Sequence, residues 1–258
     1  MQTIQALILG IIQGLTEFLP ISSSGHLVFI PKLFGWSDQG LAFDAIIHLG
    51  TLWAVIIYFR KRLWGVVTLK SSESRKLGGL ILLSIIPAAL IAFFFADWLE
   101  QNVRSTLVIG IGLIFWGIVL WLADSWGKKV QSLPDLNWQK ALFIGCAQAI
   151  ALLPGTSRSG ITITAGLFSK LTKKAAAEFA FLMSVPIIFL AGFKKLYDLM
   201  TLGFGDLTLG ILLIGFVSSA LSGFIAIWGL MKIIQKWSFK PFVVYRIIIG
   251  ILILLFLI

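Results

Sequence analysis

Two short stretches of this chain combine proline, glycine and serine with an ionisable side chain, within otherwise apolar sequence. The first is Pro20-Ile-Ser-Ser-Ser-Gly-His26 and the second is Pro154-Gly-Thr-Ser-Arg-Ser-Gly160. Each follows an apolar segment, Ile4–Leu19 or Ala141–Leu153, that the proline ends. Serine hydroxyls and a backbone freed by glycine can place several hydrogen-bond donors in a small volume, which suits an anion such as phosphate.

The second stretch carries the strongest signal, because it places an arginine between two serines. The guanidinium of Arg158 offers a planar fork that matches phosphate oxygens, and Ser157 and Ser159 flank it. A helix that starts directly after the loop would point its positive end at the same anion, and Thr162 would add a hydroxyl from its first turn. The alternative is a structural ion pair between Arg158 and Glu17.

The first stretch follows a carboxylate in an apolar helix. Glu17 occupies a position where a charge is costly, and Gln13 lies four residues earlier on the same helical face. Serines 22 to 24 offer hydroxyls, and His26 carries a side chain suited to acid, base or nucleophilic chemistry. This combination predicts a reactive site, with a capping or pairing role for Glu17 as the alternative.

Three other polar residues in apolar sequence are expected to be structural. Asp44 and His48 lie four residues apart on the first predicted span and could face the cavity or the outer membrane interface; their position near the end of the span favours an interfacial role. The single cysteine, Cys146, lies in an apolar run, where we expect it to pack as a small apolar side chain. It also excludes an internal disulfide framework.

The composition of the whole chain indicates a lipid environment. Hydrophobic residues make up 59% of the 258 residues and charged residues 12%, against about 45–50% and about 25% in soluble domains. We therefore expect an all-α integral membrane protein that forms a single membrane domain over residues 1–258. The formal net charge of +10 is expected to set topology beside anionic lipid headgroups, with no role in nucleic-acid binding.

Six segments are long and apolar enough to cross a bilayer as helices, which takes about 20 apolar residues. They are Leu41–Phe59, Leu77–Ala96, Ser105–Ala123, Ala175–Phe193, Leu207–Met231 and Pro241–Ile258.

Basic residues orient these spans, because lysine and arginine mark cytoplasmic loops. Segments 60–76, 124–140, 170–174 and 232–240 hold most of the lysines and arginines. Residues 141–169 lie between two such segments and are expected to form a re-entrant hairpin from the cytoplasmic side. By the same logic, residues 1–40 would form a hairpin from the outer side. Irregular backbone at membrane depth persists only when it is buried in protein or lines a wet cavity, so the two hairpins imply one shared polar cavity.

The two hairpins also match each other in sequence. A shift of 135 residues aligns Ala6 with Ala141, Leu7 with Leu142, Gly10 with Gly145, Gln13 with Gln148, Ser22 with Ser157, Ser24 with Ser159, and Gly25 with Gly160. Together with the opposite sides from which the hairpins start, this match predicts an inverted-topology repeat, with copies at about 1–123 and 139–258. Such repeats place their site near the bilayer midplane, where broken helices of both halves meet.

The two serine-rich stretches resemble the paired signatures of a known family, the bacterial undecaprenyl-diphosphate phosphatases, also called bacitracin-resistance proteins. The first family motif is Glu or Gln, three residues, then Glu, and it corresponds here to Gln13 and Glu17. The second is a Pro-Gly-x-Ser-Arg-Ser-Gly loop, matched at every fixed position from Pro154 to Gly160. By position, the resemblance gives functional weight to Glu17, Ser23, His26, Ser157, Arg158 and Thr162. Gln13 stands where some members have Glu, which leaves one carboxylate fewer for a metal.

The resemblance implies hydrolysis of undecaprenyl diphosphate to undecaprenyl phosphate and inorganic phosphate. That reaction recycles the lipid carrier for cell-wall synthesis and confers bacitracin resistance. The resemblance also implies a divalent cation, Mg²⁺ or Ca²⁺, for which Glu17 is the expected ligand. The expected location is the bacterial inner membrane, with the active site facing the periplasmic or external side.

For this reaction we predict Ser23 as the nucleophile and His26 as its acid/base partner, with the reverse assignment open. Glu17 and Arg158 complete the predicted catalytic set. The predicted substrate-binding residues are Gln13, Ser22, Ser157, Ser159 and Thr162. A flippase or transporter of the polyprenyl phosphate is the alternative, because inverted repeats with broken helices are typical of transporters.

Overall fold

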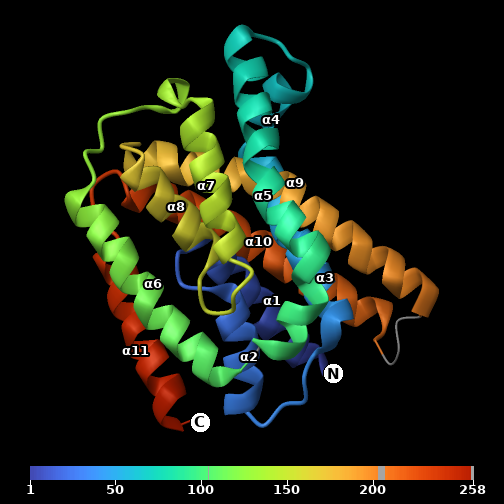
Figure 1. The fold of residues 1–258 in the computed structure, drawn as a ribbon. Coiled ribbons are helices and arrows are strands. Elements are labelled where there is room, and N and C mark those ends of the chain that lie inside the picture. The colour runs from blue at the N-terminus through green and yellow to red at the C-terminus, as the bar shows by residue number, and fades with distance from the viewer. Residues whose placement is uncertain (104, 203–206, 257–258) are drawn as a thin grey trace.

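The computed structural model describes residues 1–103, 105–202 and 207–256, which form helices joined by short connections (Figure 1). Within these ranges there is no β-strand, only an isolated bridge between Gln131 and Leu171. The helices are α1 Thr3–Phe18, α2 Ser23–Leu33, α3 Gly40–Tyr58, α4 Arg60–Val67, α5 Ser72–Asn102, α6 Thr106–Trp126, the 3-10 helix η1 Leu133–Asp135, α7 Trp138–Ile150, α8 Arg158–Phe168, α9 Lys173–Leu202, α10 Leu209–Ile233 and α11 Lys240–Phe256.

Five of the described helices, α3, α5, α6, α9 and α10, are long and apolar enough to cross a membrane. Large apolar side chains cover their outer surfaces; Phe93 and Phe94 of α5, for example, are 82% and 70% exposed. The chain is therefore an all-helical, multi-pass membrane protein, as predicted. The sixth expected span corresponds to α11, whose 17 described residues are slightly fewer than the about 20 needed. Residues 257 and 258 of that span lie outside the described residues. Helices α4 and η1 form within segments that were expected to be loops.

The four segments in which the basic residues concentrate lie together at one end of the molecule. They are residues 60–76, 124–140, 170–174 and 232–240. The contacts that join them are Lys76 Nζ to the Pro134 carbonyl at 2.7 Å, the bridge between Gln131 and Leu171, and Lys173 Nζ to the Trp237 carbonyl at 2.8 Å.

Two pairs of short helices start from opposite ends and meet inside (Figure 1). The α7–α8 pair begins and ends at the basic end, because it lies between segments 124–140 and 170–174. The α1–α2 pair begins and ends at the other end, where Met1, Trp36 and Leu207 line a common pocket. The connecting loops touch, since the Ser159 hydroxyl donates to the Leu19 carbonyl at 3.1 Å.

Proline and a strained serine shape both connecting loops. Leu19 takes the extended conformation (φ −68°, ψ 140°) that a following proline favours, so α1 ends there. Ser22 and Ser157 then adopt φ of 74° and 72° directly before α2 and α8. Residues other than glycine rarely occupy this region, and such strain is concentrated at functional sites.

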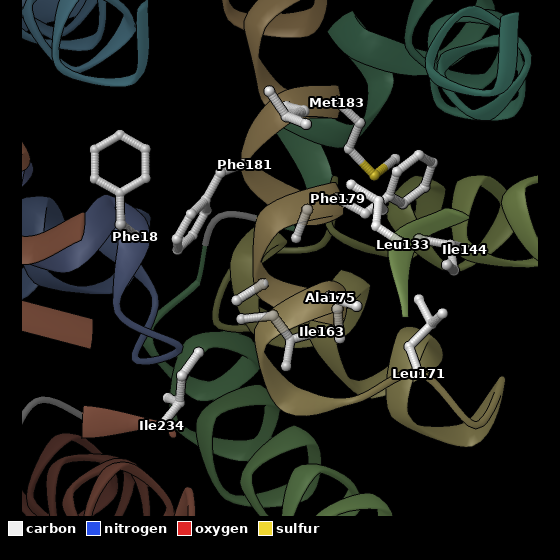
Figure 2. Close-up of a cluster of buried hydrophobic side chains, with 14 of the residues drawn as sticks. Phe18, Leu133, Ile144, Ile163, Leu171, Ala175, Phe179, Phe181, Met183 and Ile234 are labelled. Carbon is white, nitrogen blue, oxygen red and sulfur yellow. The ribbon is translucent and has the colours of Figure 1, made fainter. Parts of the chain in front are cut away.

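An aromatic and aliphatic core packs the end of α1 and the helices α7 and α8 against α9. Phe179 and Phe181 of α9 are fully buried, and Figure 2 shows them among Phe18 of α1, Ile144 of α7 and Ile163 of α8. The rings of Phe18 and Phe181 meet edge to face, with centroids 5.4 Å apart. Because Phe18 directly follows Glu17, this packing fixes where the carboxylate lies.

Small residues bring α1 against α10. A Cβ on Gly14 would lie 2.0 Å from the Ser222 hydroxyl, and one on Gly10 would lie 2.0 Å from the Ser218 hydroxyl. Close backbone approach through glycine and serine is the usual way in which membrane helices associate. It anchors the C-terminal turn of α1 in the interior of the protein.

Candidate active site

A cavity of about 240 Å³ lies where the two connecting loops meet. Its polar wall is formed by Glu17, Ser22, Ser23, Ser24, His48, Ser157 and Arg158, and its apolar wall by Ala45, Ala151, Ile187, Ile188, Ala191 and Gly192. Pockets that enclose a drug-sized ligand are about 300–1,000 Å³. This cavity therefore has room for a polar headgroup, and an attached chain would extend beyond it.

Glu17 is the centre of the polar wall. Its Oε1 accepts from Arg158 Nη2 at 2.6 Å, and its Oε2 accepts from Ser23 Oγ at 2.6 Å and from Gln13 Nε2 at 3.0 Å. The ion pair that was the structural alternative is thus present, but both of its members also line the cavity. Removing one partner of a buried ion pair costs about 3–5 kcal/mol, so this pair contributes to the fold as well as to the site.

Arg158 lines the cavity and has one buried hydrogen-bond donor without a partner among the described residues. Its Nη2 binds Glu17, whereas its buried Nη1 has no hydrogen-bond partner within the described residues. Burying an unpaired donor is unfavourable. Turning the guanidinium toward the cavity would let a phosphate oxygen satisfy this donor, while the planar fork keeps its bond to Glu17.

Two helix N-termini end at the same cavity. Ser23 is the first residue of α2 and Arg158 is the first residue of α8, and both side chains line the cavity. First-turn amides have no acceptor within their own helix, and the helix dipole makes both ends positive. One such amide, that of Gly160, is capped by Ser157 Oγ at 3.1 Å. The arrangement favours an anion between the two helices.

His26 does not take the position that we predicted beside Ser23. Its Nδ1 lies 2.7 Å from the Ser22 carbonyl and its Nε2 lies 2.7 Å from the Tyr245 hydroxyl, and its ring stacks on that of Tyr245. His26 is not among the residues that line the cavity, and the Ser23 hydroxyl donates to Glu17 instead. The expected Ser23–His26 pairing is therefore wrong for this conformation, because the first turn of α2 points the two side chains in different directions.

His48 is the histidine that lines the cavity. Its Nδ1 lies 2.6 Å from the Asp44 carbonyl, and its Nε2 lies 3.8 Å from Glu17 Oε2. Of the two positions that the sequence left open for His48, the cavity and the membrane interface, the structure shows the cavity and not the favoured interface. A signal was available in the sequence, because His48 is an ionisable residue inside a predicted span, where a functional role is the default expectation.

Some of the predicted site residues line the cavity and others do not. The residues that line the cavity are Glu17, Ser22, Ser23, Ser157 and Arg158. Those outside the lining are Gln13, His26, Ser159 and Thr162. The Thr162 hydroxyl donates to the Arg158 carbonyl at 2.7 Å, within its own helix, and does not point at an anion. Ser159 ties the two loops together, and Gln13 acts through its bond to Glu17.

The donor set of the cavity suits a cation that arrives with phosphate ligands. Glu17 is the only carboxylate in the described cavity lining, and its two oxygens already accept three hydrogen bonds. The described residues contain no group of three or more His, Cys, Asp or Glu side chains that could hold a metal ion. Mg²⁺ is commonly bound through one or two carboxylates plus substrate phosphates. The residues thus fit a substrate-borne cation with Glu17 as its one carboxylate ligand.

The chain is similar to known proteins over its full length. The chain is 44% identical to Undecaprenyl-diphosphatase 1 of Pseudoalteromonas translucida (strain TAC 125), over 100% of this chain and 99% of the relative. It is 45% identical to Undecaprenyl-diphosphatase of Aliivibrio salmonicida (strain LFI1238), over 95% of each. It is 44% identical to Undecaprenyl-diphosphatase of Alcanivorax borkumensis, over 100% of each. The family model described as bacitracin resistance protein BacA matches residues 6–252, so the chain belongs to the BacA family.

Proposed function

We propose that this protein hydrolyses undecaprenyl diphosphate to undecaprenyl phosphate and inorganic phosphate. The observation that carries the proposal is the Ser23 hydroxyl, which is hydrogen-bonded to the Glu17 carboxylate at 2.6 Å and lines the same cavity as Arg158. A serine paired with a proton acceptor and facing an anion site is suited to phosphoryl transfer. The names of the relatives give the substrate.

In the first step, Ser23 Oγ attacks the terminal phosphorus and Glu17 Oε2 accepts the hydroxyl proton. The new bond is Oγ–P, and the bond that breaks joins the terminal phosphorus to the bridging oxygen, so that undecaprenyl phosphate leaves. Arg158 and the first-turn amides of α2 and α8 neutralise the charge on the transferred phosphoryl group, which is the main demand of this chemistry.

In the second step, water attacks the phosphorus of the phosphoserine, and both of its protons stay on the phosphate that forms. Glu17 returns its proton to Ser23 Oγ as the Oγ–P bond breaks, and phosphate leaves the cavity. A bound divalent cation, with Glu17 as a ligand, would add positive charge at the phosphates. The lipid chain lies along the apolar wall formed by α9 and extends beyond the cavity, whose volume of about 240 Å³ suits the headgroup alone.

We propose that α1–α2 and α7–α8 are re-entrant hairpins of an inverted-topology repeat. The support is that the α7–α8 pair begins and ends at the basic end and the α1–α2 pair at the opposite end, and that both loops have a serine with φ near 70°. The packing partners support it as well, since α1 packs on α10 while α7 packs on α5, the helices that the 135-residue shift relates. In a bacterial inner membrane the basic end would be cytoplasmic, and the site would face outward.

The direct test measures phosphate release from undecaprenyl diphosphate by the purified protein in detergent, with and without a chelator. Acid-quenched reactions are analysed for phosphate on the peptide that contains Ser23. We expect wild type to release phosphate and Ser23→Ala and Arg158→Met to lose release. Turnover by Ser23→Ala close to that of wild type would refute the role of Ser23, and a wild type that moves a non-hydrolysable analogue across vesicles without cleaving the natural lipid would indicate a translocator. The names of the relatives favour the phosphatase.

A further inference from the structure

Arg246, on α11, is a fully buried cation outside the cavity lining. Among the described residues it forms no ion pair, and its hydrogen bonds all go to backbone carbonyls. The acceptors are Leu113 at 3.1 Å, Pro20 at 3.3 Å, Gly112 at 3.4 Å, Gly155 at 2.9 Å and Thr156 at 2.9 Å. Burying a charge without a carboxylate partner is costly, and here the carbonyl bonds offset that cost. The placement of an arginine at this buried position therefore points to a role for those bonds.

The carbonyls that Arg246 binds belong to both loops of the proposed active site. Pro20 lies in the α1–α2 loop, two residues before the strained Ser22. Gly155 and Thr156 lie in the α7–α8 loop, directly before the strained Ser157. One side chain on α11 therefore fixes the backbone that leads to Ser23 and the backbone that leads to Arg158. The remaining bonds, to Gly112 and Leu113, tie both loops to α6.

These bonds also set the direction of the loop amides. In a planar trans peptide the C=O and the following N–H point in opposite directions. With its carbonyl bound to Arg246, Thr156 therefore directs the N–H of Ser157 away from Arg246. In the same way, the Pro20 carbonyl is directed at Arg246, which lies outside the cavity lining.

The surrounding glycines show that the position of Arg246 is tightly fitted. A Cβ on Gly160 would lie 2.8 Å from Arg246 Nη1, and a Cβ on Gly155, which has φ +83°, would lie 2.5 Å from the Ile109 carbonyl. A Cβ on Gly117 would lie 3.4 Å from the Cβ of Arg246. A side chain at Gly160 would thus collide with the guanidinium, so glycine is needed for the loop backbone to come this close to Arg246.

We propose that Arg246 is a positioning residue for the phosphatase reaction: it holds both loops so that Ser23 and Arg158 face one anion across the cavity. The inference rests on the proposed function. Arg246 acts through the loops and does not touch the substrate. Because its donors are shared between the loops, its loss misplaces the nucleophile and the cationic fork relative to each other.

The test compares Arg246→Met, which removes all donors, with Arg246→Lys, which keeps the charge but not the fork. Asp124→Asn is the matched structural control, because Asp124 accepts the Phe239 amide at 2.7 Å and so ties the start of α11 to α6 far from the loops. For each purified protein, the melting temperature, kcat and KM for undecaprenyl diphosphate are measured. All rates are taken at a temperature where the variant is folded.

We expect kcat to fall about 100-fold in Arg246→Met, because misplacing reacting groups by about 1 Å has an effect of that order. KM should change by less than about tenfold, since the lipid contacts remain, and Arg246→Lys should recover part of kcat. Asp124→Asn should lower the melting temperature while its kcat stays close to that of wild type.

Two results would overturn the inference. One is a folded Arg246→Met or Arg246→Lys protein with the kcat of wild type; if Arg246→Met does not fold, Arg246→Lys decides alone. The other is an Asp124→Asn protein that loses kcat as much as the arginine variants at the same loss of melting temperature, because the effect would then be one of stability. A wild type that releases no phosphate would instead refute the proposed function.

Discussion

The two loops of the cavity end in the same backbone conformation but carry different side chains. Ser22 and Ser157 share a φ of 74° and 72°, and each loop contains a pair of serine hydroxyls 3.3 Å apart. The next residue is Ser23 in one loop and Arg158 in the other, and both begin a helix. The same local conformation thus presents the proposed nucleophile, Ser23, from one loop and the proposed anion-binding cation, Arg158, from the other. The helix before the first loop adds Glu17, where the 135-residue shift puts Leu152.

The comparison predicts that substitutions of the corresponding residues Ser23 and Arg158 have different effects on turnover and binding. Ser23→Ala should lower kcat by about 10³-fold or more, because the nucleophile is absent, and should still bind a non-hydrolysable diphosphate analogue. Arg158→Lys should lower kcat by about 10²-fold and weaken analogue binding, because the planar fork is lost. Kinetics and analogue binding on the same preparations check this. Loss of analogue binding in Ser23→Ala would contradict the division of roles.

Glu17 and Leu152 should differ in what they contribute to stability. Glu17→Gln leaves Arg158 without its counter-ion and should lower the free energy of unfolding by about 3–5 kcal/mol, along with the rate of phosphoryl transfer. Leu152→Met, at the corresponding position, is a volume-conserving change and should cost less than about 1.5 kcal/mol. Unfolding in detergent micelles measures both. Equal losses in the two variants would show that the ion pair adds nothing to the fold.

The two histidines test which one takes part in acid/base chemistry, since His48 lines the cavity and His26 bonds Tyr245. His48→Ala should lower kcat by roughly 10–100-fold, because Nε2 faces Glu17 in the cavity. Tyr245→Phe removes the hydroxyl bonded to His26 Nε2 and should act mainly on the stability of the α2–α11 contact. Turnover and melting temperature of both variants separate the effects. A Tyr245→Phe variant with a larger loss of kcat than His48→Ala would return the acid/base role to His26.

The smallest expected difference is in stability, between alanine variants of the two strained serines, Ser22 and Ser157. Ser157 Oγ accepts the Gly160 amide at 3.1 Å, whereas Ser22 makes no side-chain capping bond. Ser157→Ala should therefore lower the free energy of unfolding by about 1 kcal/mol more than Ser22→Ala, which keeps the same strained φ. Parallel unfolding curves give the difference. Equal destabilisation would mean that the cap is not formed in the protein.

Several features of the fold could be predicted from the sequence because their causes are local. Pro20 and Pro154 end helices through their own ring geometry, and the residues that follow are serine and glycine. Long apolar runs predicted helices in lipid, and the structure has five described helices that are long and apolar enough to span. The concentration of basic residues in four segments predicted one common end, and those segments are in contact.

The direction of side chains within apolar helices could not be predicted in this way. A helix in lipid is apolar on all sides, so periodicity does not reveal which face is buried. His26 follows three serines in the sequence, but its ring turns to Tyr245, which lies 219 residues away in the chain. His48 stands in an ordinary apolar span and yet faces Glu17.

The sequence by itself determined the lipid environment, the helix breaks and the two serine-rich loops, because apolar content and proline act within a few residues. Only the tertiary structure decided that Glu17 joins Ser23 to Arg158, that His48 lines the cavity, and that Arg246 binds both loops. Those arrangements depend on close packing between helices distant in sequence, such as α1 on α10. Contacts of that kind follow from shape complementarity over many residues.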